Sequence, residues 1–546
     1  MFVHTQMLPY LNAIKLYIPL SIDISVFFIY THLTAASLIL DKFTASTNKQ
    51  MKRLLFTGLI MSLVFMVNAQ GTQKKAAVSK TQAPSAGYNI PVTVAPFKNS
   101  KVYLGCYYGK YKNLVDSVML DGQSSGVLKG KQKLPGGIYF MVSPSHTLLF
   151  EFLMDSKQHF SIKADSSRPD ALVITGSTEN TLFQDYTKYL SQKVPHLQQL
   201  QQQLKDAKSR QDSAAIQNQL VKGNKELVDY RDNITKQHAG SMLDIFFKAM
   251  KRPEPPAMPK KTDGTLDSLY PARYVKEHFW DDVPFDDDRL LRTPFFDPKI
   301  DEYFKYYVSP EPDSVSAEVN YILLYARSAK DMFKYLLGKF TDKYINPEIM
   351  GQDKVFIFLF NNYFSKGDTT WLNAKQKEFI FNRAYSLMAN QIGVQAAQMD
   401  LIDTAGKETP LYNIQAPFTF VIFWDPNCSH CKEQVPRVDS IYDAKWKAMG
   451  VKIYAVNIDE KAMDPWKKFI LEHHLDGWLH VYQATEERQK EQSAGKANFR
   501  QLYDVFQTPT FYLLDDKKHI IAKKLSLEQF DEVIEAKLKN KASSKN

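Results

Sequence analysis

Short runs of β-branched and aromatic residues, separated by turn residues, fill the chain from residue 88 to residue 175. Residues 101–107 read KVYLGCY and residues 138–142 read IYFMV, with a Pro-Gly-Gly turn shortly before the second run. Runs of this length and composition are typical of strands, and closely spaced turn signals favour a sandwich or barrel. The pattern therefore predicts a small antiparallel, sandwich-like β domain over residues 88–178.

The apolar positions change to a helical spacing after residue 178. Leu197, Leu200 and Leu204 recur at intervals of three and four, which places them on one face of a helix. This first part favours a helical hairpin or a short coiled coil that acts as a spacer. Aromatic residues are dense further on, and at helical spacing they favour a packed core over a ligand-binding site. We expect an α-helical region over residues 179–390.

A continuous apolar run of strand length, FTFVIFW, spans residues 418–424. Such a run is typical of a strand that is buried on both faces of a central parallel sheet. A Cys-x-x-Cys motif at residues 428–431 and a predicted helix follow it, and then a strand, a helix, a hairpin and a final helix. This order predicts an α/β domain over residues 391–540, with residues 541–546 as a tail.

Near the start of the chain, a Met-Lys-Arg sequence precedes an apolar stretch that ends in small residues. This is the pattern of a signal peptide, predicted over residues 51–69, and its apolar part is short for a membrane span of about 20 residues. We therefore expect Met51 to be the initiator, residues 1–50 to be a mis-called upstream extension, and residues 70–87 to be a flexible leader. The alternative is a genuine transmembrane segment within residues 14–40.

Export would place the protein in the cell envelope, and in the periplasm if the organism is Gram-negative. In that case the mature form has no integral membrane span.

The formal net charge of +10 comes from scattered lysines and not from a basic stripe with interleaved aromatic residues. Nucleic acid is therefore not an expected partner. The three cysteines are too few for a disulfide-stapled scaffold, so the fold depends on its hydrophobic core. Cys106 lies in a predicted strand, and we expect it to be a buried apolar residue and not a reactive thiol.

Cys428 and Cys431 form the candidate redox centre. Cys428 stands where the predicted helix begins, and unpaired backbone N–H groups together with the helix dipole favour a thiolate there. The thiolate is the nucleophile in disulfide exchange, and Cys431, one turn later, resolves the mixed disulfide. The pair is its own redox-active disulfide, so we expect no cofactor. Zinc would need four ligands, and no second Cys-x-x-Cys is present, so we expect no metal.

A second motif lies about 80 residues further on, where residues 503–510 read YDVFQTPT. This resembles the stretch of the thioredoxin superfamily that contains its cis-proline. The C-terminal domain is most similar to the exported TlpA/ResA-like thiol–disulfide oxidoreductases, because Trp424 stands four residues before Cys428 and Pro436 stands five residues after Cys431. The resemblance implies a thioredoxin fold for this domain. The preceding β domain and helical region resemble modules of unknown function in exported bacterial proteins.

The resemblance also implies roles for single residues. Pro509 would be cis and pack against the cysteine pair, and the backbone of Thr508 would contact a bound peptide. Trp424 would have a substrate-binding or structural role.

The residues at three positions leave open what stabilises the Cys428 thiolate and what accepts the proton. His430 precedes the second cysteine, as in oxidase and isomerase members, so it either stabilises the Cys428 thiolate or is a solvated side chain. Ile422 and Gln434 stand where relatives have a carboxylate that assists proton transfer, so the proton acceptor is not assigned.

Taken together, the chain is predicted to be multidomain, with an all-β sandwich-like domain, a central α-helical region and a C-terminal α/β thioredoxin fold. Its predicted function is an exported thiol–disulfide oxidoreductase that acts on protein disulfides. Its partners would be client proteins with cysteines or disulfides, and an upstream membrane or periplasmic electron donor or acceptor. The direction of the reaction stays open. The alternative is a binding or scaffold protein of the cell envelope in which the thioredoxin-like domain is an accessory.

Overall fold

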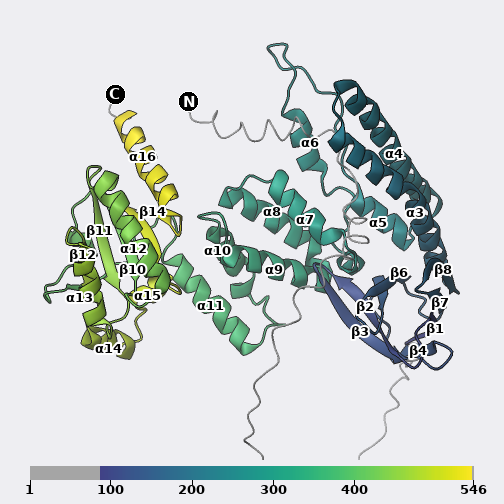
Figure 1. Cartoon of the computed structure of the whole chain (residues 1–546), viewed down its shortest axis with the longest axis horizontal. Coiled ribbons are helices and arrows are strands. Elements are labelled where there is room, and N and C mark those ends of the chain that lie inside the picture. Colours follow the sequence, from purple (N-terminus) through teal and green to yellow (C-terminus); the bar gives the residue numbers. More distant parts are fainter. Residues whose placement is uncertain (1–86, 544–546) are drawn as a thin grey trace, which may run out of the picture. The chain divides into compact units, whose positions relative to one another are not determined.

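The computed structural model describes residues 87–543, apart from the side chains of Pro169 and Ala542. The predicted upstream extension, the signal peptide and nearly all of the leader lie outside the described residues. The chain divides into two compact units, of which the first ends at Glu302 and the second begins at Tyr303. Figure 1 shows the elements of both units, each of which is described by itself.

Two four-stranded sheets form the N-terminal β domain, with strand orders β4-β1-β7-β8 and β3-β2-β5-β6. Their apolar faces share one core, to which β1 contributes Ile90, Val92 and Val94. This confirms the sandwich-like all-β domain. One pair departs from the antiparallel expectation, because β1 and β7 run parallel. The strands are β1 (Tyr88–Ala95), β2 (Lys101–Tyr108), β3 (Tyr111–Met119), β4 (Ser125–Gly130), β5 (Gly137–Val142), β6 (Leu148–Met154), β7 (Ser161–Asp165) and β8 (Arg168–Thr175).

A helical hairpin follows the sandwich. Leu197 and Leu200 of its first helix pack against Leu220 and Leu227 of its second helix, so the leucine spacing that predicts these helices also forms the contact between them. Serine side chains cap the N-termini of both helices. The helices of this unit are α3 (Thr178–Asp206), α4 (Arg210–Gln237), α5 (Met242–Met250), α6 (Tyr270–His278), the 3₁₀ helix η2 (Asp288–Arg292) and α7 (Phe296–Tyr306), which runs into the second unit.

The second unit begins with helices whose dense aromatic residues are buried, as expected for a packed core. Phe333, Phe340, Phe356 and Phe360 are each at most 5% exposed. The elements are α8 (Pro312–Tyr325), η3 (Ala326–Ser328), α9 (Lys330–Ile345), α10 (Asp353–Asn362), η4 (Phe364–Lys366) and α11 (Ala374–Met388).

A six-stranded sheet forms the centre of the C-terminal domain, in the order β14-β13-β10-β11-β12-β9. Strands β10, β11 and β12 run parallel, and β13 is antiparallel to β10. Every residue of β10 is buried, which explains its unbroken apolar sequence. The strands are β9 (Ile402–Asp403), β10 (Phe418–Trp424), β11 (Val451–Asn457), β12 (Leu479–Tyr482), β13 (Thr510–Asp515) and β14 (Ile520–Lys523).

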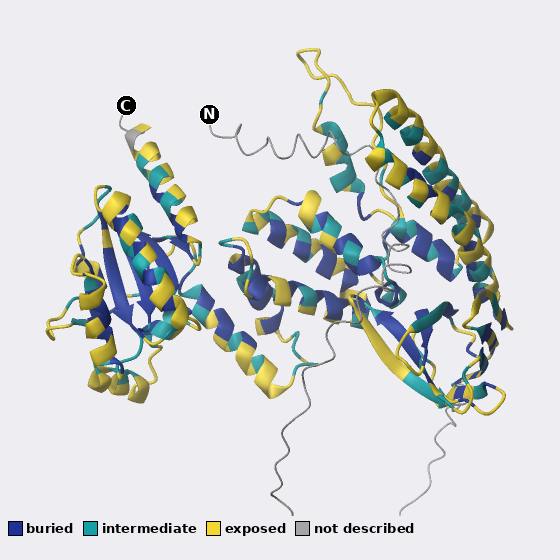
Figure 2. Cartoon of the chain, in the orientation of Figure 1, coloured by how far each residue is buried: buried dark blue, intermediate teal, exposed yellow. Residues whose placement is uncertain are grey.

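Helices cover both faces of this sheet, and their outer sides are exposed (Figure 2). Residues of α12, α13 and α16 pack on one face, and those of α15 pack on the other. This is the predicted α/β thioredoxin fold. Pro436 lies inside α12, which ends in a π-helical turn, η6. The helices are α12 (Ser429–Ile441), η6 (Tyr442–Trp446), α13 (Met463–Glu472), α14 (Thr485–Ser493), α15 (Phe499–Leu502) and α16 (Leu527–Ser543), with the 3₁₀ helix η5 (Leu411–Asn413) before β10.

Within the part of the chain that the structure describes, every helix is too short or too polar to cross a membrane.

Candidate functional site

The two cysteines lie where the chain leaves the buried strand β10 and enters α12. Cys428 is the N-cap residue of the helix, and its carbonyl oxygen accepts the first helical hydrogen bond from the N–H of Lys432 at 3.1 Å. Cys428 is partly exposed, whereas Cys431, one turn into the helix, is fully buried. Both are free thiols in the structure. One sulfur is therefore open to a substrate, and the other lies behind it.

The surroundings of Cys428 favour its thiolate. Partial burial raises the pKa of the thiol, but the nearby side chain of Thr508 and the backbone N–H groups of Cys431 and His430 outweigh it, and the pKa falls below its usual value. The backbone groups are the unpaired donors of the first turn of α12, which stabilise a negative charge at a helix N-terminus.

The pKa of the Cys431 thiol is shifted in the opposite direction. Burial raises its pKa to about 12, although the N–H of Asp425 and the side chain of Thr508 act to lower it. The Asp425 N–H lies 3.5 Å from the Cys431 sulfur. At neutral pH the exposed thiol is thus the more easily ionised, as a nucleophile must be, and the buried thiol stays protonated.

The loop before β13 lies against Cys428. The Thr508–Pro509 peptide bond is cis. The Cys428 thiol donates a hydrogen bond to the carbonyl oxygen of Thr508 at 3.4 Å, across 80 positions of sequence. The structure thus brings the Thr508 carbonyl to Cys428 and gives Pro509 a cis peptide bond.

Trp424 lies in the core of the domain, whereas His430 lies at its surface. Trp424 is fully buried, with its ring 5.3 Å from that of Phe469, so its position is that of a core residue that supports the start of α12. His430 is exposed in the first turn. Its backbone N–H is the group that acts on the Cys428 thiol.

Around the site, Ile422 is buried in the core and Gln434 is half-buried. The groups that set the pKa of Cys431 include no carboxylate. Among residues 87–543, no group of three or more His, Cys, Asp or Glu side chains is placed to hold a metal ion. Cys106 lies in β2 of the other unit, is 5% exposed, and has a pKa raised by burial.

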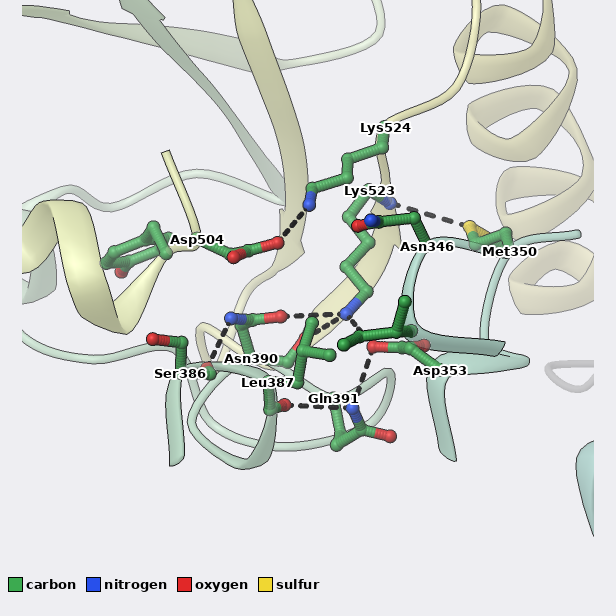
Figure 3. Close-up of polar contacts among 12 residues, drawn as sticks. Asn346, Met350, Asp353, Ser386, Leu387, Asn390, Gln391, Asp504, Lys523 and Lys524 are labelled. Atoms are coloured by element: carbon green, nitrogen blue, oxygen red, sulfur yellow. Dashed lines mark hydrogen bonds and ion pairs between the residues drawn. The ribbon is translucent and has the colours of Figure 1, made fainter. Parts of the chain in front are cut away.

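A buried polar cluster that sequence reasoning missed joins the helices of the second unit to the thioredoxin-like domain (Figure 3). Lys523, at the end of β14, donates to Asp353 Oδ2 at 2.6 Å and to two oxygens of Asn390 at 2.8 Å. All three residues are at most 5% exposed. In the sequence these are ordinary polar residues of helix ends and of a strand, so no local signal distinguishes them from a solvated surface.

Two parts of the chain match families. Residues 392–528 match the AhpC/TSA family, and residues 231–390 match the domain of unknown function DUF5106. No curated protein matches the chain.

Several solved structures are similar to this chain. A domain of a possible thiol-disulfide isomerase from Cytophaga hutchinsonii is 33% identical, with 28% of this chain and 96% of that chain covered and a TM-score of 0.24. A thioredoxin-like protein from Bacteroides caccae is 20% identical, with 53% and 99% covered and a TM-score of 0.41. A putative thiol:disulfide interchange protein DsbE from Chlorobium tepidum is 22% identical, with 27% and 97% covered and a TM-score of 0.23.

Proposed function

We propose that this chain, whose residues 392–528 form a thioredoxin-like domain that matches the AhpC/TSA family, is an exported thiol–disulfide oxidoreductase that acts on protein disulfides. The observation that carries the proposal is the asymmetry of the cysteine pair. Cys428 is partly exposed with a lowered pKa, and Cys431 is buried with a pKa of about 12.

In the reductive direction, the Cys428 thiolate attacks one sulfur of a client disulfide. A mixed disulfide forms, and the other client sulfur leaves as a thiolate that takes up a proton. Cys431 then loses its proton and attacks the Cys428 sulfur. The second client thiol leaves, and the products are a reduced client and an oxidised Cys428–Cys431 disulfide. The reverse sequence oxidises a client dithiol.

Geometry supports a role for Thr508 and Pro509 as the platform for the client chain. The Thr508 carbonyl faces Cys428, so this loop lies next to the sulfur that a client disulfide would have to reach. His430 contributes through its backbone N–H, and Trp424 through packing. An upstream membrane or periplasmic electron donor or acceptor would return the pair to its working state.

The test is reduction of insulin by the mature chain with dithiothreitol as electron source, compared with Cys428→Ser. We expect the wild type to accelerate the reaction and the variant to be inactive. Equal rates with and without the wild-type protein would refute the enzyme proposal and favour the binding or scaffold alternative. The reduction potential of the pair, measured in glutathione buffers, would then give the direction. A value near about −270 mV indicates a reductase, and one near about −180 mV indicates an isomerase.

A further inference from the structure

An exposed aromatic side chain lies in the loop whose Thr508 carbonyl contacts Cys428. Phe506 is 75% exposed, more than any other large apolar side chain in the described part of the chain. It lies two residues before Thr508, whose carbonyl oxygen contacts the Cys428 sulfur. Two residues of backbone span at most about 7 Å, so the Cα of Phe506 lies within that distance of the residue that contacts the reactive sulfur.

The ring does not project freely, because the guanidinium group of Arg383 lies over it, 5.0 Å from the ring centre. Arg383 comes from α11, within the residues that match DUF5106 and not from the thioredoxin-like domain. It is 5% exposed and donates to Asn346 Oδ1 at 2.6 Å. A cation held over an aromatic face attracts the ring and so favours this position of it.

Arg383 also holds the start of the loop that carries Phe506. It forms a buried ion pair with Asp504, which is 1% exposed and has a positive φ of 53°. Lys524 binds the second carboxylate oxygen of Asp504 (Figure 3). Burial and the charge of Arg383 lower the pKa of Lys524 to about 8, which reflects the crowding of charge at this point. The loop from Asp504 to Pro509 is therefore anchored by a helix outside its own domain.

We propose that Phe506 is a specificity-determining residue that binds an apolar side chain next to the cysteine of a client polypeptide, and that Arg383 is the positioning residue that holds Phe506 in place. The proposal rests on the thiol–disulfide exchange proposed above and names its substrate class as unfolded or partly folded chains with apolar residues beside a cysteine. One face of the ring is occupied by Arg383, and the rest of the ring is exposed in the loop whose Thr508 carbonyl contacts Cys428. Arg383 is paired with Asp504 and is 5% exposed, so the ring, and not the guanidinium group, is the part of this contact that a client can touch.

The experiment uses the reduced mature chain in single turnovers with two synthetic peptide disulfides. The peptides are identical except that leucines flank the cysteine in one and serines in the other, and bis(2-hydroxyethyl) disulfide serves as the small substrate. The dependence of rate on peptide concentration gives a half-saturation concentration and a maximal rate. In Phe506→Ala we expect the half-saturation concentration for the leucine peptide to rise about 5- to 30-fold, the scale of a contact worth about 1–2 kcal/mol. The maximal rate with the leucine peptide should change by less than about twofold, which is about 0.4 kcal/mol. The rates of reaction with the serine peptide and with the small disulfide should also change by less than about twofold.

A matched control removes an equally exposed apolar side chain elsewhere in the same domain. Leu471, near the end of α13, is 67% exposed, and Leu471→Ala should behave as the wild type. An unchanged half-saturation concentration in Phe506→Ala, or an equal rise in Leu471→Ala, overturns the proposal. An oligomer that dissociates in Phe506→Ala while the half-saturation concentration is unchanged would assign the ring to a second copy of the chain, and it also overturns the proposal.

The role of Arg383 is tested in a variant in which the one cation left without its carboxylate, Lys524, has a side chain that is 40% exposed and can be solvated. In the double variant Arg383→Met, Asp504→Asn, the ion pair is replaced by neutral groups, and asparagine tolerates the positive φ of this position. We expect the melting temperature to stay near that of the wild type and the half-saturation concentration for the leucine peptide to rise as in Phe506→Ala. A wild-type value in this folded variant overturns the positioning role. Failure of the proposed function looks different, because then the wild type reacts with none of the three disulfides or Cys428→Ser reacts as well as the wild type.

Discussion

Replacing Lys523 by methionine measures what the buried cluster between α10 and β14 contributes to stability. The ammonium group uses its three protons on Asp353 and Asn390, and after the substitution the Asp353 carboxylate keeps only the hydrogen bond from Gln391 at 2.8 Å. Breaking a buried ion pair by removing one partner costs about 3–5 kcal/mol. The variant can instead protonate the carboxylate, which at pH 7 costs about 4 kcal/mol for an aspartic acid of ordinary acidity. We therefore expect the free energy of unfolding to fall by about 3–4 kcal/mol at pH 7.

The sign of the pH dependence follows from the same reasoning. A carboxylate that is protonated in the folded variant but ionised when unfolded costs stability above its unfolded pKa, and the cost shrinks as the pH falls toward that value. At pH 5 the loss should therefore be about 1.5 kcal/mol, from the difference between pH 5 and the ordinary value of about 3.9.

The assay is urea unfolding of the mature chain, followed by tryptophan fluorescence. Four of the six tryptophans lie in the thioredoxin-like domain, namely Trp424, Trp446, Trp466 and Trp478, so the signal reports mainly on that domain. Lys517→Met is the control, because Lys517 is an exposed lysine of the same hairpin and should change stability by less than about 0.5 kcal/mol. In the double variant with Asp353→Asn, the loss should be smaller than the sum of the two single losses by about 1–3 kcal/mol. A loss under about 1 kcal/mol in Lys523→Met, or strict additivity in the double variant, would refute the reasoning.

The remaining predictions concern the cysteine pair and the β domain. Iodoacetamide should label Cys428 at a rate that reaches half its maximum at a pH below the ordinary thiol pKa of about 8.5. Mass spectrometry should find Cys431 unmodified, and labelling of both cysteines at similar rates would contradict the asymmetry. Trp424→Ala should lower the free energy of unfolding by about 3–5 kcal/mol, the usual cost of emptying a buried aromatic site, and urea titration with a midpoint near that of the wild type would speak against a packing role. Gly105→Ala places a methyl group 2.2 Å from the Phe140 ring and should lower the free energy of unfolding by about 1–3 kcal/mol, measured by urea unfolding followed by circular dichroism. Gly122→Ala, whose methyl group meets open space, should change this free energy little.

Local pattern determined which elements form in this chain. The apolar run of β10, the helical leucine spacing of α3 and α4, and the cysteine at the start of α12 are each visible in a few neighbouring residues, because strand burial, helix packing and capping act over that range. These elements sufficed for the fold class and for the redox pair, and a resemblance in residues 503–510 supplied the loop opposite the pair.

Tertiary structure alone decided which distant residues meet. The parallel pairing of β1 with β7 has no local signal, because strand pairing depends on how the intervening strands are placed. The asymmetry of Cys428 and Cys431 arises from burial and from Thr508, 80 residues away. Lys523 and Asp353 are 170 positions apart. A charged residue in the sequence predicts a solvated surface. Only a fold that brings its counter-charge and its hydrogen-bond acceptors together offsets the free-energy cost of removing the charge from water.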